Sequence, residues 1–325
     1  MVSAHTWDTT PMTDLDLLRV TCALCGNDRP EPFADGYDYE FKTTADLFHM
    51  VRCGSCGHVY LNPRPKEEEF SKIYPPHYAA FVETRSCWVK KFRKHWEAKK
   101  VRRIRRLLGA GPKRLLDSGC GNGRFLSVLR EYGDREWELV GIDLEAEAIA
   151  QCREKGLTGY EGKAEDFMLG EGTWDAVIML QVLEHSKDPV RLCRKVHALL
   201  KPGGYWMIET PCLGSLDFQW FKKSLWTLYH FPRHWHLFSQ QSLKALLMRC
   251  GFSIVQAEYT VAPTAWILSL HNFFRSKKYP DGFVRSFNAG NVFLLACFVI
   301  LDYVLVMLGC STSNQRVIAR KPADV

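Results

Sequence analysis

Three glycines at alternate positions follow an acidic residue in the segment KRLLDSGCGNGRFL, residues 113–126. A short apolar run ends at Asp117, and Gly119, Gly121 and Gly123 lead into apolar residues at helical spacing. Glycine is needed where the backbone adopts positive φ or lies directly against a ligand. A dinucleotide-binding loop would place its third glycine three positions after the second, which this loop does not. The segment therefore predicts a strand, a glycine turn and a helix that hold a small molecule against the main chain.

Two cysteine pairs offer a second kind of chemistry. Cys22 and Cys25 form one CxxC turn, and Cys53 and Cys56 form another. Two such turns supply four sulfurs, which is a complete tetrahedral site for Zn²⁺. A closed site leaves no open coordination position, so we expect zinc that stabilises the fold. Two unrelated reduced pairs or a redox motif are the alternatives, and we expect His58 to be a packing or surface residue.

The composition is that of a folded protein. The chain has 325 residues, of which 46% are hydrophobic, enough for one large domain or two smaller ones. The formal net charge of +7 permits an anionic membrane or a nucleic acid as a partner without requiring one. The N-terminal sequence lacks the basic-then-apolar pattern of a signal peptide. We therefore expect the twelve cysteines to be reduced and cytosolic.

A pattern of alternating strands and helices follows the glycine loop. Asp143 lies at the end of the second strand, where its carboxylate can accept hydrogen bonds from both hydroxyls of a ribose. The pattern predicts a doubly wound α/β sheet. After the strand that ends at Asp117, the expected strands cover residues 139–142, 158–160, 175–180, 205–210, 252–258 and 316–320, with helices over 145–155 and 189–200.

These motifs together resemble the class I S-adenosylmethionine (SAM) methyltransferases of the ubiquinone and small-metabolite type. Within that class the chain is similar to the families called methyltransferase domain 23 and methyltransferase domain 11. The resemblance covers nearly all of residues 110–258, and one branch of these enzymes carries a preceding four-cysteine ribbon. It implies a seven-stranded Rossmann-like sheet with SAM as the methyl donor. The segments that carry it are LLDSGCGNGRFL, VGID, DAVIMLQVLEHSKDP, LLKPGGYWMIETP and HFPRHWHLFS, in this order, ahead of GFSIV.

The resemblance also implies which residues contact SAM. Glu165 or Asp166 would grip the adenine, although either could instead be a charge at a helix N-terminus. Enzymes that methylate the amines of bases usually carry (Asn/Asp)-Pro-Pro-(Tyr/Phe) after the fourth strand, and this chain has QVLEH there. We therefore expect an oxygen or carbon acceptor. The full set of expected SAM contacts is Asp117, Gly119, Cys120, Gly121, Gly123, Asp143, Leu144, Glu165, Asp166 and Gln181.

Histidines are the candidate bases. Methyl transfer from a sulfonium requires alignment of the reacting atoms and exclusion of water, and a hydroxyl acceptor also needs a base. By analogy with the family, His185 lies at the tip of the fourth strand beside the sulfonium, and His230, His234 and His236 supply further candidates. We expect His185 or His234 to be the base or a substrate ligand, and Glu184 to orient the site. Each histidine could instead cap a helix or hold a loop.

Two segments precede the sheet. In residues 63–86 prolines interrupt any long helix, leaving one short helix expected over 66–73. The resemblance places Tyr74, His77 and Tyr78 near the substrate cleft, unless they pack between domains. Residues 87–108 predict a basic amphipathic helix, which could lie on an anionic membrane or on nucleic acid. We expect a solvated helix that covers the sheet.

A hydrophobic insertion over residues 259–315 separates the last two strands. Its apolar run at 292–309 approaches the length of a membrane-spanning helix. Spanning would place Asp302 near the bilayer centre and would detach the last strand from its sheet, so we reject it. We expect either a hairpin that dips into the membrane interface or a helix pair buried as a lid or as a dimer contact.

We therefore expect a cytoplasmic SAM-dependent methyltransferase with a structural zinc ribbon. The acceptor would be a small molecule, a sugar or a lipid-linked compound, with peripheral contact to the inner face of a membrane or a homodimer as options. RNA methylation and a non-catalytic SAM-binding protein that holds a partner are the rival functions, and we do not expect a nucleic-acid partner. The expected organisation is a flexible lead (1–18), a zinc ribbon (19–62), a connector with the basic helix (63–108) and a methyltransferase domain (109–325).

Overall fold

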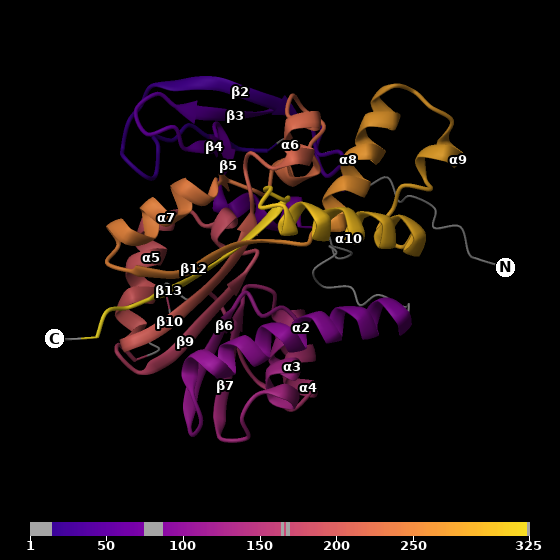
Figure 1. The fold of residues 1–325 in the computed structure, drawn as a ribbon. Helices are drawn as coiled ribbons and strands as arrows, with labels where there is room; N and C mark the ends of the chain where they lie inside the picture. The colour runs from indigo at the N-terminus through magenta and orange to yellow at the C-terminus, as the bar shows by residue number, and fades with distance from the viewer. Residues whose placement is uncertain (1–14, 75–86, 164–165, 167–169, 324–325) are drawn as a thin grey trace.

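A computed structural model describes residues 15–74, 87–163, 166 and 170–323. At its centre lies a seven-stranded sheet with the strand order β12-β13-β10-β9-β6-β7-β8 (Figure 1). All pairings are parallel except those of β13, which runs antiparallel between β10 and β12. The expected sheet is confirmed. The strands are β6 (Lys113–Ser118), β7 (Trp137–Asp143), β8 (Thr158–Glu161), β9 (Trp174–Leu180), β10 (Leu200–Pro211), β12 (Ser253–Thr260) and β13 (Asn314–Arg320).

The fifth strand begins earlier than the sequence indicated. Leu200 already pairs with Trp174, and the register then shifts before Tyr205 pairs with Ala176. Gly203 adopts a φ of 80° within this shift, a conformation that glycine tolerates easily. The Lys-Pro-Gly-Gly segment is therefore an irregularity inside β10 and not a loop before it.

Helices cover both faces of the sheet (Figure 1). Neighbouring strand residues point to opposite faces, so Leu115 packs into the core beneath one helical layer and Leu116 into the core beneath the other. The basic helix forms as expected, with Val101 and Ile104 buried against the sheet. One layer contains α2 (Cys87–Leu108), α3 (Arg124–Tyr132) and α4 (Ala146–Glu154), and the other contains α5 (Pro189–Leu199) and α7 (Gln240–Arg249).

The cysteine-containing segment forms a separate small sheet. Strands β2 (Pro30–Gly36), β3 (Phe48–Cys53) and β4 (Val59–Leu61) pair antiparallel, and β11 (His236–Leu237) adds a fourth strand from much later in the chain. This ribbon sheet therefore includes backbone from the segment after β10, which ties it to the rest of the chain.

The connector after the ribbon is short and partly helical. A strand pair, β1 (Leu17–Leu18) with β5 (Arg64–Pro65), precedes a 3-10 turn η1 (Glu67–Glu69) and helix α1 (Phe70–Ile73). The expected short helix is thus present. Tyr74 is half-buried, whereas His77 and Tyr78 lie outside the described residues.

Short helices and a helical insertion complete the fold. Between β10 and β12 the chain forms α6 (Leu216–Phe221) and the 3-10 turn η3 (Thr227–Tyr229). Between β12 and β13 it forms α8 (Pro263–Ser276), α9 (Asp281–Val284) and α10 (Val292–Met307), while β13 stays in the sheet. Asp302 on α10 is buried within the protein and accepts hydrogen bonds from the Ala262 amide and the Trp266 indole. Among the helices that the structure describes, none is both long and apolar enough to cross a membrane.

Candidate active site

The glycine turn lies between β6 and α3. Gly119, Gly121 and Gly123 all have positive φ, at 79°, 52° and 74°. The amides of Gly119 and Cys120 donate to the carbonyl of Ile142 at 2.7 and 3.1 Å, which fastens the turn to β7. A Cβ on Gly119 would lie 2.3 Å from Cγ2 of Val182. The turn therefore lies directly against the segment that follows β9.

Two carboxylates end the neighbouring strands β6 and β7. Asp143 accepts hydrogen bonds from the amides of Gly121 at 2.7 Å and Glu145 at 3.0 Å. Asp117 is 2% exposed. Burial, followed by the negative charge of Asp143, raises the pKa of Asp117 to about 7, against an opposing contribution from Lys100. Burial also raises the pKa of Asp143.

This edge of the sheet fits SAM. The cofactor carries a sulfonium and an ammonium group, and a positive ligand would relieve the repulsion between two adjacent buried carboxylates. Glycine lets the turn adopt positive φ and pack directly against its neighbours, because a Cβ would lie 2.3 Å from Val182 at Gly119 and 2.6 Å from Cys152 at Gly123. The site lies at the carboxyl ends of the strands where the strand order reverses, which is the usual ligand position in such sheets.

The structure gathers most of the expected SAM residues at this edge. Leu144 directly follows Asp143 and is exposed, Cys120 is buried in the turn, and Asp166 is exposed. Gln181 has a φ of 61° at the end of β9, and its side-chain amide donates to Asn314 at 2.9 Å. Glu165 lies outside the described residues. The individual roles of these residues remain predictions.

Glu184, His185 and His234 come together next to this edge. Glu184 and His185 belong to the 3-10 turn η2 (Leu183–His185), which follows β9. One ligating atom from each of the three side chains lies within 4.8 Å of the others. The rings of His185 and His234 lie 4.7 Å apart and nearly perpendicular, and His230 lies 4.8 Å beyond His234. Both histidines expected as the base therefore share one cluster.

Hydrogen bonds define the tautomers of the two central histidines. Nδ1 of His185 lies 2.9 Å from the carbonyl oxygen of Arg233, and Nδ1 of His234 lies 2.8 Å from that of Leu228. A carbonyl oxygen only accepts, so each Nδ1 carries the hydrogen and each Nε2 keeps a lone pair. Burial lowers the pKa of His185 to about 3 and holds that of His234 well below its usual value. Both rings are thus neutral at pH 7.

Glu184 is fully buried beside these rings. Its Oε2 accepts a hydrogen bond from the Thr210 hydroxyl at 2.9 Å, while its Oε1 has no hydrogen-bond partner among the described residues. Burial raises the pKa of Glu184 to about 8. The carboxyl group and one ring nitrogen of each histidine could therefore share a proton, or hold a divalent cation.

The sequence analysis overlooked Arg233, which anchors this cluster. Its guanidinium donates to both carboxylate oxygens of Asp38 at 3.0 and 2.9 Å, and its Nε donates to the carbonyl of Ile73 at 2.7 Å. Tyr74 contributes a hydroxyl 3.1 Å from Nδ1 of His185. The sequence did contain an indication of this role, namely an arginine inside the aromatic-rich segment FPRHW. A cation buried among aromatic side chains needs an acidic partner.

The remaining candidate histidines have other surroundings. Nδ1 of His230 lies 2.9 Å from the carboxylate of Glu40. His236 lies in the ribbon sheet, where its Nδ1 is 2.9 Å from Nε2 of His58. Both of these rings are buried, which confirms the expected packing role of His58. The structure therefore separates His236 from the cluster of Glu184, His185 and His234.

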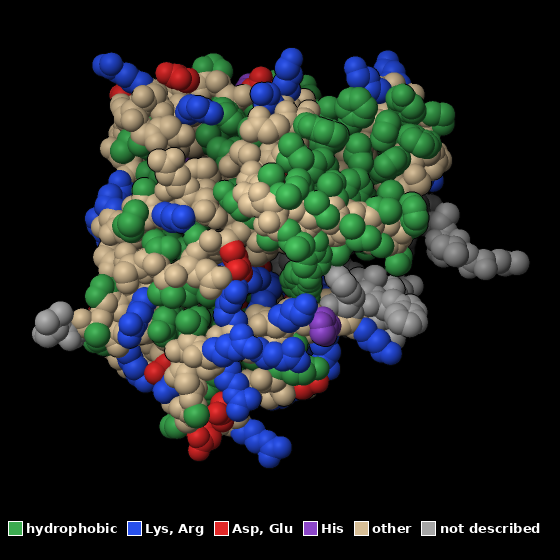
Figure 2. Space-filling model, in the orientation of Figure 1, with side chains coloured by type: hydrophobic (Ala, Val, Ile, Leu, Met, Phe, Trp, Pro, Cys, Tyr) green, Lys and Arg blue, Asp and Glu red, His purple; other side chains and the backbone are tan. Residues whose placement is uncertain are grey.

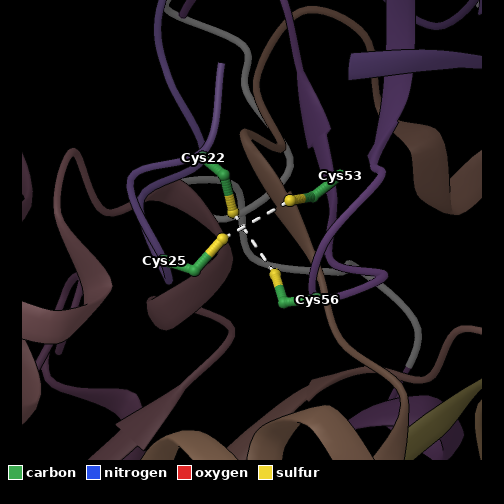
Figure 3. Close-up of side chains that lie close together, drawn as sticks. All are labelled: Cys22, Cys25, Cys53 and Cys56. Atoms are coloured by element: carbon green, nitrogen blue, oxygen red, sulfur yellow. Dashed lines mark hydrogen bonds between the residues drawn. The ribbon is translucent and has the colours of Figure 1, made fainter. Parts of the chain in front are cut away.

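The four cysteines of the two CxxC pairs converge (Figure 3). Their sulfurs all lie within 4.8 Å of one another, with 3.5 Å between Cys22 and Cys56 and 3.5 Å between Cys25 and Cys53. Tetrahedral Zn²⁺ with Zn–S bonds of about 2.3 Å needs sulfurs about 3.8 Å apart. The donor set and its spacing fit a closed zinc site.

Comparison with known proteins gives partial matches to methyltransferases. A ubiquinone biosynthesis O-methyltransferase of Pseudomonas aeruginosa is 33% identical over 109 residues, which cover 31% of this chain and 46% of that protein. The enzyme of the same name from Vibrio parahaemolyticus is 36% identical over 105 residues, covering 30% and 43%. The chain thus matches less than half the length of these curated relatives.

A solved structure and a family model extend these matches. Phosphoethanolamine N-methyltransferase 2 of Haemonchus contortus, in complex with SAM, has a TM-score of 0.50 and 16% identity, covering 91% of this chain and 69% of that chain. This likeness shows the fold. The family model of the methyltransferase domain matches residues 92–257, more than half of the 325 residues. The chain therefore belongs to the methyltransferase domain family of SAM-dependent methyltransferases.

Proposed function

We propose that the chain transfers the methyl group of SAM to an oxygen atom of a small-molecule, sugar or lipid-linked acceptor. The observation that carries this proposal is the buried cluster of Glu184, His185 and His234 next to the glycine turn. Two neutral imidazoles with available Nε2 atoms can accept the proton of a hydroxyl. The names of the partial relatives also support an oxygen acceptor.

In this proposal the carboxyl edge of the sheet binds SAM. SAM supplies a methyl group on a positively charged sulfur, which makes the methyl group electrophilic. Asp143 accepts hydrogen bonds from the ribose, Asp117 offsets positive charge, and Glu165 or Asp166 lies against the adenine. The other residues of the proposed SAM site are Gly119, Cys120, Gly121, Gly123, Leu144 and Gln181.

Glu184 assists the histidine base in this mechanism. A histidine whose pKa lies near 3 holds a proton poorly on its own. An ionised Glu184 beside it would stabilise the imidazolium that forms as the hydroxyl proton is accepted. The pKa of Glu184 is about 8. The rate of methyl transfer should therefore rise with pH up to about this value.

The zinc ribbon has a structural role in this proposal. The four cysteines would hold Zn²⁺, and the metal would fix the turns at the ends of the ribbon strands. The ribbon carries Asp38, which binds Arg233 and thereby the loop that contains His234. Zinc would act on catalysis only by keeping these residues in place.

A labelling experiment tests the proposed reaction. The purified protein is incubated with methyl-labelled SAM and an extract of the source organism, which is then separated into lipid, polar-metabolite and RNA fractions. Label on oxygen in the lipid or metabolite fraction supports the proposal, and label confined to RNA overturns the acceptor class. His185→Gln should lose most of the activity, whereas His49→Gln, at a half-buried histidine on β3 of the ribbon, serves as the matched control.

A further inference from the structure

Helix α10 exposes an apolar face. Phe293, Ile300 and Met307 are 75%, 64% and 84% exposed and follow one another at helical spacing. The single charged residue of the helix, Asp302, points inward to the Ala262 amide and the Trp266 indole. A helix that is apolar on all sides is normally buried on all sides. We call the exposed side the α10 face; it consists of Val292, Phe293, Ile300, Tyr303, Val304, Met307 and Leu308.

Neighbouring side chains extend this surface. Tyr279 and Phe283, around α9, are each almost half exposed. Hydrophobic side chains gather over α8, α9 and α10 in one continuous region (Figure 2). Isolated exposed apolar residues are ordinary, but a contiguous apolar region marks a surface that binds something.

Cationic side chains border the α10 face on two sides. The end of α8 and the segment from there to α10 expose Arg275, Lys277, Lys278 and Arg285, against one exposed acid, Asp281. On the other side Trp96 of α2 contacts Tyr303 edge to face at 5.3 Å. The solvent side of α2 therefore continues this surface with basic residues (Figure 2). Its exposed basic side chains include Arg93, Lys94, Lys99, Arg102, Arg105 and Arg106.

We propose that the α10 face docks into the interface of an anionic lipid bilayer. Aromatic and aliphatic side chains would enter the boundary between headgroups and acyl chains, and the cationic border would contact anionic headgroups. A second copy of the chain is a poorer occupant, because a symmetric contact would bring the two cationic borders together. The inference goes beyond the proposed reaction and holds for any acceptor.

Vesicle binding tests the proposal. The full-length protein is sedimented with vesicles of phosphatidylcholine alone and with vesicles that also contain phosphatidylglycerol. We expect clear binding to the anionic vesicles, weakened by salt. The double variant Phe293→Glu/Met307→Glu should bind at least tenfold more weakly, because two apolar anchors are lost. Met248→Glu is the matched control, since Met248 is 56% exposed on α7, away from this surface.

A charge variant separates the two contributions. Lys277→Glu/Lys278→Glu should weaken binding to anionic vesicles about tenfold or more. This variant leaves the apolar residues intact, so it also serves if the α10 double variant fails to fold. Thermal unfolding and SAM binding, measured on every variant, establish that the fold and the cofactor site are retained.

Three outcomes would overturn the inference. The first is no binding of the wild-type protein to anionic vesicles, and the second is equal binding by wild type and both double variants. The third is a dimer in solution that Phe293→Glu/Met307→Glu dissociates, with no vesicle binding, which would make a second copy the occupant. None of these outcomes depends on methyl transfer, so failure here is distinguishable from failure of the proposed reaction.

Discussion

Arg233 and Asp38 form a fully buried, two-pronged ion pair between segments that lie 195 residues apart in the chain. The backbone carbonyl of Arg233 also accepts a hydrogen bond from Nδ1 of His185. The ribbon, the loop with His234 and the turn after β9 are thereby joined through one residue. The position of the histidine cluster consequently depends on a contact with the ribbon.

Removing Asp38 should destabilise the protein strongly. Burial alone would raise the pKa of Asp38, but Arg233 outweighs it and holds the pKa below its usual value. Asp38→Ala leaves Arg233 buried without its partner, and we expect a loss of about 3–5 kcal/mol in the free energy of unfolding. Denaturant unfolding measures it. Glu138→Ala is the control, because its pair with Arg114 is exposed and should contribute about 1 kcal/mol or less; similar losses in both variants would contradict the prediction.

Metal analysis should find one zinc per chain. Cys25→Ser removes one of the four sulfur ligands, so we expect loss of the metal and a lower temperature of unfolding, since metal binding and folding are coupled. Cys297→Ser, at an exposed cysteine on α10, should change neither. A chain that is purified without metal, with unchanged stability after zinc is added or chelated, would remove the structural role proposed for the cysteines.

Local sequence determined the parts of the site that were predictable. The glycine turn, Asp143 at the end of β7 and the two CxxC turns each depend on residues close together in the chain, and the structure places them as expected. The pairing of Arg233 with Asp38 and of His236 with His58 joins distant segments. Periodicity carries no information about such contacts.

Burial is the second property that the sequence did not disclose. An unperturbed histidine has a pKa near 6.5, and on that basis the sequence predicted His185 as an ordinary general base. In the structure burial lowers its pKa to about 3 and raises that of Glu184 to about 8. The insertion shows the same limit, because the sequence left open whether its apolar helices are buried or lie at a membrane interface, and only the structure shows that one side of α10 is exposed.

The affinity for SAM should depend on pH through Asp117. Its pKa is about 7 in the unliganded protein, and the ionised form attracts a positive ligand better. We expect the affinity of the wild type to increase severalfold, relative to Asp117→Asn, between pH 6 and 8. Isothermal calorimetry of both proteins measures the two affinities. Protonation of SAM itself affects both proteins equally, so it cancels in the ratio of wild-type to variant affinity. A ratio that stays constant over this range would exclude Asp117 from the SAM site.

Gly119→Ala should weaken SAM binding for two reasons. The added Cβ would lie 2.3 Å from Cγ2 of Val182, and the φ of 79° is strained for alanine. We expect a loss of at least tenfold in affinity. Gly119→Ala/Val182→Ala relieves the clash but not the strain, so it should recover only part of the loss. Gly172→Ala, also at positive φ but with open space around it, controls for backbone strain alone. An affinity for SAM in Gly119→Ala equal to that of the wild type would contradict the placement of the turn in the SAM site.

Glu184→Gln should remove a pH dependence of stability. The pKa of Glu184 is about 8 in the folded protein, above its usual value of 4.5, so the folded state binds a proton that the unfolded state has released. Stability is therefore greatest below about pH 4.5 and falls as the pH rises toward 8, by at most about 5 kcal/mol.

The difference between the two proteins isolates this group. His185, with its lowered pKa, acts in the opposite direction, since stability then rises between about pH 3 and 6.5. Denaturant unfolding at pH 6.5, 7 and 8 should show wild type losing stability relative to Glu184→Gln across this interval. Parallel stability profiles would mean that Glu184 is ionised at pH 6.5 already, and the neighbouring imidazole rings would then have a permanent carboxylate beside them.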